Sequence, residues 1–251
     1  MSVRPGIKPS GIPVLDSEVS PKEKAEFVKQ MFDEISPRYD FLNSALSAGI
    51  HRAWRVFATR CAGLSVGDSA LDVCSGTGEW ISELKRLVGE SGHVVGLDFS
   101  FGMLQSGRLR FERNATVRLQ ADATRLPFQN NTFDAVTVAF GIRNVADPAL
   151  AFREMTRVLR PNGKVVCLEF SHIKNPVFRT LYNLHARFLM PLVGGLVSGR
   201  RDAYTYLPES VKRFYSRQAL AAIMEESGLT DVRVVDLMLG LVSVHVGAKV
   251  A

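Results

Sequence analysis

The stretch Ala70-Leu71-Asp72-Val73-Cys74-Ser75-Gly76-Thr77-Gly78-Glu79-Trp80 decides how this chain folds. Residues 70–73 are mostly apolar, which predicts the end of a buried parallel strand. Gly76 and Gly78 permit a tight turn with close backbone approach, and helical spacing of apolar residues begins at Trp80. A strand, a glycine turn and a helix form the first unit of a doubly wound α/β fold. The ligand of such a fold binds at the carboxyl end of the strand.

The acids around this turn favour one class of ligand. A dinucleotide fingerprint needs a third glycine where Ile81 stands, so an NAD-type domain is the weaker alternative. Asp72 could accept hydrogen bonds from a ligand ammonium, and Asp98, at the end of the next strand, suits a ribose diol. At the end of the third strand, Asp122 and Ala123 could contact an adenine edge. An amine, a ribose and an adenine, with no phosphate cradle, describe S-adenosylmethionine. For Asp98 alone, a solvated carboxylate is the alternative.

The composition is that of a globular protein with a full core. The chain has 251 residues, of which 46% are hydrophobic and 22% charged. Lys and Arg number 31 against 25 Asp and Glu, and the net charge of +6 favours an anionic partner, either nucleic acid or acidic lipid. Cys61, Cys74 and Cys167 show no C-x-x-C spacing, which indicates small buried side chains in a reducing cytosol. The Cys and His residues have no metal-ligand spacing, so we expect no metal.

The chain is predicted to form one domain, residues 20–251, behind a flexible N-terminal arm, residues 1–19. Residues 20–66 precede the first strand and are expected to form a helical lid over the strand ends. Strands alternating with helices, then a last helix and a hairpin, predict a seven-stranded mixed sheet with helices on both faces. The expected order begins βαβαβαβαβ.

Residues 172–215 form a long amphipathic insertion that carries aromatic and basic side chains. Such a helix suits an anionic membrane surface, and packing on its own domain is the alternative. The longest apolar run, Phe188–Val197, is too short and too interrupted by Pro and Gly to cross a bilayer. The first residues also lack the apolar core of a signal peptide. We therefore expect a cytoplasmic protein, peripherally bound to the inner face of the membrane.

Four motifs match a known family. The first is Tyr39-Asp40-x-x-Asn43-x-x-x-Ser47-x-Gly49-x-His51-Arg52-x-Trp54, and the second is Arg157-Val158-Leu159-Arg160-Pro161-Asn162-Gly163-Lys164-Val165-x-x-Leu168-Glu169-x-Ser171. Two shorter motifs are Phe140-Gly141-Ile142-Arg143-Asn144 and Tyr206-Leu207-x-x-Ser210. From about residue 22 to its C-terminus, the chain resembles the ubiquinone/menaquinone biosynthesis C-methyltransferases.

This resemblance implies a Class I S-adenosylmethionine-dependent methyltransferase fold. It also implies methylation of a ring carbon of a polyprenylated 1,4-naphthoquinol, that is, conversion of demethylmenaquinol to menaquinol. The family usually has serine where this chain has Ala139, so a backbone contact or a water is expected to replace that hydroxyl. Spacing and resemblance together assign these residues to the cofactor: Asp72, Gly76, Thr77, Gly78, Asp98, Asp122, Ala123 and Ala139.

The reaction requires a group that removes a phenolic proton, because the ring carbon is a poor nucleophile until the quinol is ionised. His51 is the near-neutral base of the predicted lid. We expect Tyr39 and Asn43 to orient the quinol oxygens, and Arg143 to stabilise the quinolate, with Asn144 beside it. A hydrogen bond at a helix N-terminus is the alternative for His51, and a salt bridge is the alternative for Arg143.

Other functions stay open at this point. A polyprenyl benzoquinol, the substrate type of ubiquinone synthesis, is the near alternative. A nucleic-acid methyltransferase would need a clustered basic groove or an RNA-binding module, and neither is evident, so we expect no nucleic acid. A non-catalytic scaffold that binds S-adenosylmethionine would have lost Arg143, Asn144 or His51, and all are present. The assembly, a homodimer or a complex of quinone-synthesis enzymes, is likewise open.

Overall fold

The computed structural model describes residues 20–185 and 201–251. The predicted N-terminal arm, residues 1–19, lies outside this part of the chain. The middle of the predicted insertion, residues 186–200, which contains the apolar run Phe188–Val197, also lies outside it.

A seven-stranded sheet forms the centre of the molecule, in the order β3-β2-β1-β4-β5-β7-β6. The first five strands are parallel, and β7 pairs antiparallel with both β5 and β6, which confirms the predicted mixed sheet. The order reverses between β1 and β4, so a ligand site is expected at their carboxyl ends. The strands are β1 (Ser69–Val73), β2 (His93–Asp98), β3 (Val117–Gln120), β4 (Phe133–Ala139), β5 (Leu159–Phe170), β6 (Leu229–Leu237) and β7 (Val242–Lys249).

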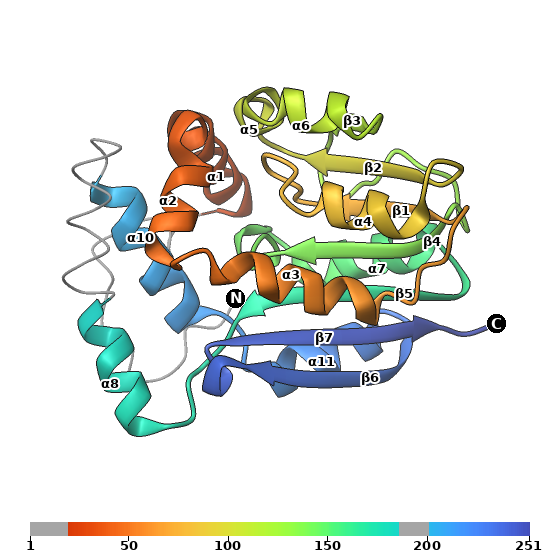
Figure 1. Ribbon diagram of the computed structural model, residues 1–251. Coiled ribbons are helices and arrows are strands. Elements are labelled where there is room, and N and C mark those ends of the chain that lie inside the picture. Colours follow the sequence, from red (N-terminus) through yellow and green to blue (C-terminus); the bar gives the residue numbers. More distant parts are fainter. Residues whose placement is uncertain (1–19, 186–200) are drawn as a thin grey trace.

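Helices cover both faces of the sheet and its carboxyl end (Figure 1). α3 and α4 lie on one face and α7 and α11 on the other, while α1, α2, α8 and α10 gather where the parallel strands end. The α-helices are α1 (Pro21–Ile35), α2 (Tyr39–Leu46), α3 (Ile50–Cys61), α4 (Ile81–Val88), α5 (Phe101–Ser106), α6 (Arg108–Arg113), α7 (Pro148–Val158), α8 (Pro176–Leu184), α10 (Arg201–Arg213) and α11 (Arg217–Glu226). Short 3-10 helices are η2 (Ser36–Arg38), η3 (Ile142–Asn144) and η5 (Met238–Gly240).

One local expectation was wrong. Residues 121–132 form turns, so no helix separates β3 from β4 as the expected order requires. β5 begins at Leu159, and its register shifts between Phe133 and Ala135 of β4, leaving residues 160–163 in a bulge. α2 begins at Tyr39, directly after the 3-10 helix that contains Ser36 and Pro37.

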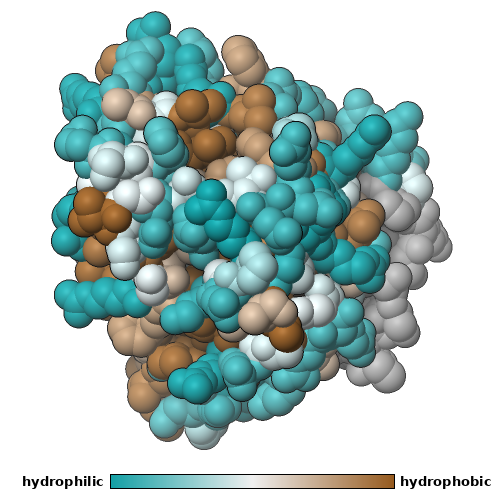
Figure 2. Space-filling view, turned by 90° about the vertical axis from the view of Figure 1, so that its right-hand side faces the viewer, coloured by the Kyte–Doolittle hydropathy of each residue, from teal (hydrophilic) through white to brown (hydrophobic). Residues whose placement is uncertain are grey.

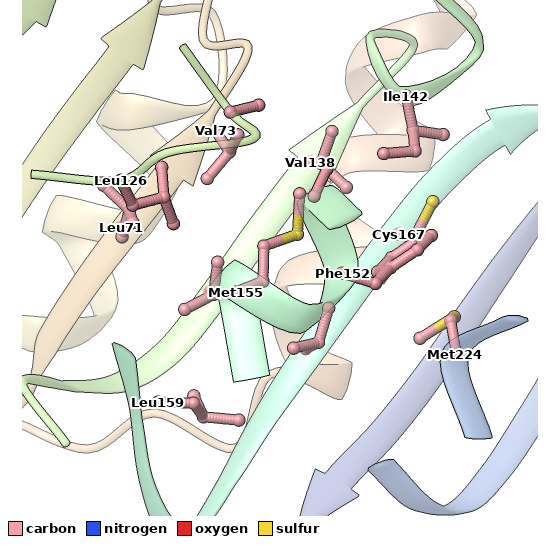
Figure 3. Close-up of a cluster of buried hydrophobic side chains, with 14 of the residues drawn as sticks. Leu71, Val73, Leu126, Val138, Ile142, Phe152, Met155, Leu159, Cys167 and Met224 are labelled. Atoms are coloured by element: carbon pink, nitrogen blue, oxygen red, sulfur yellow. The ribbon is translucent and has the colours of Figure 1, made fainter. Parts of the chain in front are cut away.

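Apolar side chains from α7 fill the core on one face of the sheet (Figure 3). Phe152 and Met155 of α7 are fully buried and lie against the apolar residues of β1, β4 and β5. On the opposite face, Trp80 and Leu84 are buried against α3. The two layers hold the central strands rigidly, so the residues at the strand ends keep fixed positions.

The first helices lie over the carboxyl end of the sheet. A capping box begins α1: the Ser20 N–H donates to Glu23 Oε2 at 2.8 Å, and the Glu23 N–H donates to Ser20 Oγ at 3.2 Å. Val28, Met31 and Ile35 of α1 form a small apolar core with Leu42 of α2 and, notably, with Tyr206 of α10. By contrast, α3 packs on the face of the sheet.

Within residues 20–185 and 201–251, no helix is long and apolar enough to cross a bilayer. Figure 2 shows the face at the amino ends of the parallel strands, where hydrophilic residues cover much of the surface and hydrophobic ones form separate groups.

Gly96 of β2 lies directly over the buried ring of Phe111. A Cβ atom there would meet Phe111 Cε1 at 2.5 Å and Ser75 Oγ at 3.0 Å. Because the Phe111 side chain is only 1% exposed and has no room to move, we expect Gly96→Ala to lower the free energy of unfolding by about 1–3 kcal/mol. Urea denaturation measures this loss.

Gly247→Ala on β7 is the matched control and should cost less. A Cβ atom at Gly247 would meet its nearest neighbour, Leu229 Cβ on the edge strand β6, at 3.0 Å, which is farther than the 2.5 Å contact at Gly96. Equal losses in the two variants would contradict the expectation.

Candidate functional site

The glycine turn after β1 is fastened to the end of β2. Cys74, Gly76 and Gly78 have φ values of 55°, 57° and 77°, the left-handed region in which glycine carries no steric cost. The Ser75 N–H donates to the Leu97 carbonyl at 2.9 Å, and the Gly76 N–H donates to Asp98 Oδ2 at 2.7 Å. The turn therefore brings its backbone close to the acid that ends the neighbouring strand.

Asp98 is held by two backbone donors. Its Oδ2 accepts from Gly76 and its Oδ1 accepts from the Ser100 N–H at 2.8 Å. Burial raises the pKa of Asp98 to about 6, although these hydrogen bonds act in the opposite direction. Such a desolvated carboxylate has a fixed orientation and is well suited to accept hydrogen bonds from a pair of ligand hydroxyls.

A cavity, here called the strand-end cavity, opens at these strand ends. Asp122 is exposed there, and its Oδ1 accepts from the backbone and side chain of Thr124, both at 2.8 Å. Phe99 and Met103 supply apolar walls, and Ala25 and Val28 cover the cavity from α1. Five of the residues predicted for the cofactor line this cavity, namely Gly76, Asp98, Asp122, Ala123 and Ala139.

The other three predicted cofactor residues lie behind the turn and do not line the strand-end cavity. Asp72 is 2% exposed, and its Oδ1 accepts from the Thr137 hydroxyl at 2.7 Å. Thr77 donates its hydroxyl to Asp40, and the Gly78 N–H donates to the Ser75 carbonyl at 2.8 Å. These residues shape the turn, whereas the cavity surface is formed by their neighbours.

The thiol of Cys74 belongs to the wall of the strand-end cavity. Burial raises the pKa of Cys74 well above its usual value, and the carboxylates of Asp98 and Asp72 raise it further. The thiol therefore stays protonated at neutral pH.

Polar contacts fasten α1 and α2 to the loops around this cavity. Asp33 of α1 accepts from the Ser100 hydroxyl at 2.6 Å and from the Gly102 N–H at 2.9 Å. Asp40 of α2 accepts from Thr77 and pairs with Arg110 at 2.8 Å. The first two helices are thus joined to the loops after β1 and β2, and they close the cavity from above.

A second and larger cavity, here called the apolar cavity, adjoins the first. It lies between α2, α3, α8 and α10. Phe32, Tyr39 and Phe140 line both cavities, so the two spaces share a wall. Four predicted catalytic residues line the apolar cavity, namely Tyr39, Asn43, His51 and Arg143.

Aromatic rings give the apolar cavity flat walls. Phe140 packs between two neighbours in tilted geometry, with ring centroids 4.8 Å from Phe170 and 6.1 Å from Trp54. All three rings line the cavity. Flat apolar walls of this kind suit a fused aromatic ring more than a charged or branched ligand.

Arg143 supplies a fixed positive charge at this wall. Its NH1 group pairs with Glu169 Oε1 at 2.8 Å and also donates to the Phe140 carbonyl. Its guanidinium lies 5.5 Å from the centroid of the Phe170 ring. Burial raises the pKa of Glu169, and the charge of Arg143 counters that rise. The ion pair gives the buried Glu169 of β5 a partner of opposite charge, and it holds the Arg143 side chain at the apolar cavity.

Asn144 lies on the other side of this wall. It lines the strand-end cavity rather than the apolar cavity, and its Oδ1 accepts from the Tyr206 hydroxyl at 3.0 Å. Lys24 of α1 donates to the backbone carbonyls of Arg143 and Val145 at 3.4 Å and 3.2 Å. The loop after β4 is therefore joined to both α1 and α10.

Both ring nitrogens of His51 are engaged. Nδ1 lies 2.6 Å from Ser47 Oγ, and Nε2 lies 3.0 Å from Glu79 Oε1. Arg55 completes the group, with NH2 at 3.0 Å from Glu79 Oε2. Burial raises the pKa of Glu79, but the hydrogen bond of His51 and the charge of Arg55 outweigh it, so the pKa lies below its usual value.

Sequence reasoning missed several residues of the site. Ser47 stands four residues before His51 in the first motif, so the spacing of these two residues could be read from the sequence. Glu79 directly follows the glycine turn, but its contact with α3 depends on how the helix packs on the sheet. For Asp33 and Lys24, no signal in the sequence points to the loops that they contact.

Over residues 20–185 and 201–251, no three His, Cys, Asp or Glu side chains gather as a metal site would require.

Comparison with known sequences agrees with the geometry. The sequence model of the ubiE/COQ5 methyltransferase family matches residues 19–249. A demethylmenaquinone methyltransferase of Staphylococcus aureus (strain JH9) is 41% identical over 229 residues, which cover 91% of this chain and 95% of the relative. The same figures hold for the demethylmenaquinone methyltransferase of strain Newman.

Solved structures show the same fold at low sequence identity. A SAM-dependent methyltransferase of Thermotoga maritima, described as a possible histamine N-methyltransferase, has a TM-score of 0.63 at 18% identity. The match covers 88% of this chain and 99% of that one. A SAM-dependent methyltransferase of Aquifex aeolicus has a TM-score of 0.55 at 18% identity and covers 93% and 100% of the two chains.

The buried carboxyl of Asp72 predicts a pH-dependent stability. Burial raises its pKa from 3.8 to about 7. The folded chain therefore keeps a proton that the unfolded chain loses, and this group lowers stability as the pH rises from about 4 to about 7. We expect Asp72→Asn, which can still accept from Thr137, to remove that decline, which amounts to at most about 1.4 kcal/mol per pH unit.

Urea denaturation at pH values of about 4, 6 and 8 tests this expectation. The stability of the variant relative to the native chain should increase with pH over this range and level off above the pKa of Asp72. Parallel stability curves for the two proteins would show that Asp72 does not titrate in this window.

Proposed function

Because the chain belongs to the ubiE/COQ5 methyltransferase family, we propose that it methylates a ring carbon of a polyprenylated demethylnaphthoquinol, converting demethylmenaquinol to menaquinol. The enzyme is a methyltransferase that uses S-adenosylmethionine. The observation that carries the choice of substrate is the pair of cavities that share Phe32, Tyr39 and Phe140. The strand-end cavity is lined by the acids Asp98 and Asp122. The apolar cavity is larger, has aromatic walls and is lined by Arg143.

The residues of the strand-end cavity fit S-adenosylmethionine. Asp98 would hold the ribose hydroxyls, and Asp122 with the backbone at Ala123 would contact the adenine. A Cβ at Gly76 would meet Met103 Cε at 3.1 Å, so a side chain there would narrow the cavity. When bound, the cofactor supplies a methyl group carried on a positively charged sulfur.

The apolar cavity would receive the quinol ring. The rings of Phe140, Phe170 and Trp54 would contact the ring faces. Arg143, fixed by Glu169, would stabilise the negative charge that develops on a ring oxygen. Tyr39 and Asn43 lie on the same wall and would orient the ring oxygens. Burial raises the pKa of Tyr39, so its hydroxyl stays protonated and can donate.

Asn144 would act on the cofactor side of the wall. Because its amide lines the strand-end cavity and bonds to Tyr206, we propose that it holds the loop after β4 in place and contacts the cofactor rather than the quinol. Closure by α1 and α2 would exclude water from both cavities, which strengthens each electrostatic contact.

A lipid tail on the substrate would bring the enzyme to the membrane. Val177, Leu181 and Leu184 of α8 are 69%, 60% and 50% exposed, and α8 contains Arg179 but no acid. Leu239 of η5, at the same end of the sheet, is 64% exposed. We propose that these side chains enter an anionic membrane surface beside the apolar cavity, which Leu181 also lines.

Methylation of reduced demethylmenaquinone by the purified enzyme tests the proposed reaction. With S-adenosylmethionine and detergent, we expect mass spectrometry to show a quinone heavier by one methylene. Asp98→Ala, which removes the carboxylate from the strand-end cavity, should give no product. Methylation of a polyprenyl benzoquinol in preference to the naphthoquinol would overturn the proposed substrate, and methylation of RNA alone would overturn the proposed class.

A charge on α8 should weaken membrane binding. We expect Leu181→Glu to reduce binding to vesicles of anionic phospholipid on the order of tenfold, the equivalent of losing one buried leucine. Vesicle flotation at low salt measures the bound fraction. Leu109→Glu on α6, where the leucine is 55% exposed, makes the same charge change away from α8 and is the control. Equal effects of the two substitutions would refute docking through α8.

A further inference from the structure

We propose that Ser47, His51 and Glu79 form a proton relay that ionises the substrate. In this proposal, which rests on the proposed function, Ser47 is the catalytic residue that contacts the ring hydroxyl. His51 receives the proton through Ser47, and Glu79 is a positioning residue for His51. The relay deepens the expectation that His51 is the base, because the structure leaves neither of its ring nitrogens to contact the substrate directly.

The geometry places the relay at the wall of the apolar cavity. Ser47 and His51 both line this cavity, together with Tyr39, Asn43 and Arg143. The His51 ring is 5% exposed and lies between its two partners, 2.6 Å from Ser47 Oγ and 3.0 Å from Glu79 Oε1. Proton transfer needs such short contacts, and both are within reach.

Counting hydrogens shows that Ser47 can pass a proton. Its hydroxyl has one hydrogen but two partners at 2.6 Å, the Asn43 carbonyl and His51 Nδ1. When His51 is neutral, the Ser47 hydroxyl donates to Nδ1. When His51 is protonated, Nδ1–H donates to Ser47 Oγ, and the serine hydrogen turns to the Asn43 carbonyl. Whether His51 is neutral or protonated, each N–H and O–H donor of His51 and the Ser47 side chain therefore has an acceptor.

Glu79 stabilises the protonated state of His51. The carboxylate stays ionised, because the pKa of Glu79 lies below its usual value. It accepts from His51 Nε2, which orients the ring so that Nδ1 faces Ser47. Among the described residues, the other charged or titratable groups near this cluster are Arg55 on α3, Arg110, which acts on Glu79, and the cavity-lining residues Tyr39, Arg143 and His185.

The proton step balances without any added reagent. The O–H bond of the quinol breaks, and its electron pair remains on the ring oxygen as a quinolate. The proton forms a bond to Ser47 Oγ while the original serine hydrogen moves to His51 Nδ1. Ser47 ends neutral and His51 ends as an imidazolium beside the Glu79 carboxylate. After methyl transfer the ring carbon carries both its hydrogen and the methyl group. Loss of that ring proton to solvent restores the aromatic ring, and His51 returns its proton to the ring oxygen, so one proton is released overall.

Other groups at this wall are poor bases. A guanidinium such as Arg143 does not lose its proton in proteins, and burial raises the pKa of the Tyr39 phenol. His185 also lines the apolar cavity, with its ring centroid 6.3 Å from that of Tyr182. It is the competing base, so the test includes it.

Ser47→Ala tests the first link of the relay. We expect kcat for the quinol to fall about 100-fold, with the KM for the quinol and the affinity for S-adenosylmethionine nearly unchanged. Ser44→Ala, on the same helix but outside the cavity lining, is the matched control and should retain native kcat. Ser47→Thr keeps the hydroxyl and should recover much of the rate. A native kcat in Ser47→Ala, or a comparable loss in His185→Gln alone, would overturn the relay.

Glu79→Gln tests the second link through the pH–rate profile. Loss of the carboxylate removes the negative charge that faces His51 Nε2, so the acid limb of kcat should move to lower pH. Glu83→Gln, a half-buried acid of α4 paired with Arg86, is the control and should leave the profile in place. A Glu79→Gln profile that falls in height but does not move would indicate a structural role only.

A spectroscopic measurement separates failure of the relay from failure of the proposed function. In the substrate-free enzyme, nitrogen NMR of His51 should show Nδ1 altered by Ser47→Ala and Nε2 altered by Glu79→Gln, and neither by Ser44→Ala. If the native enzyme methylates no quinol, the proposed function fails while this measurement still tests the two hydrogen bonds. If it methylates the quinol and the ring nitrogens respond to neither substitution, the relay alone fails.

Discussion

The hydrogen bond from the Gly76 N–H group to the Asp98 carboxylate, 2.7 Å long, is the contact on which the site depends. It joins the turn after β1 to the end of β2, next to the point between β1 and β4 where the strand order reverses. The turn reaches this position because its backbone adopts left-handed values at three residues. In return, two backbone N–H groups hold the carboxylate in a buried setting that would otherwise favour its neutral form.

The helices before and after the sheet build the rest of the site around this contact. α1 and α2 contact the loops after β1, β2 and β4 through Asp40, Asp33 and Lys24. Tyr206, from the late helix α10, packs among the apolar residues of α1 and bonds to Asn144. The wall between the two cavities therefore combines segments from both ends of the chain, and its rigidity comes from their mutual packing rather than from the sheet alone.

Local patterns predicted most of the fold and five of the residues that line the strand-end cavity. The glycine turn, the acid at the end of β2 and the closing hairpin all follow from short-range spacing. Asp72 could not be placed in this way, because its surroundings depend on the register that sets it beside Thr137 of β4. The partner of His51 depends on how α3 packs against α4, since Glu79 is distant in sequence. Contacts between layers of a fold leave no periodic signal along the chain.

Cys74 illustrates a hazard that the fold avoids. Its sulfur belongs to the wall of the strand-end cavity, next to the place where an electrophilic methyl group would sit. A thiolate there would compete with the substrate for that methyl group and would inactivate the enzyme by self-alkylation. Burial and the surrounding acids raise the pKa of Cys74 so far that the nucleophilic form is scarce. The carboxylates at the strand ends thus help to keep the protein's own sulfur inert.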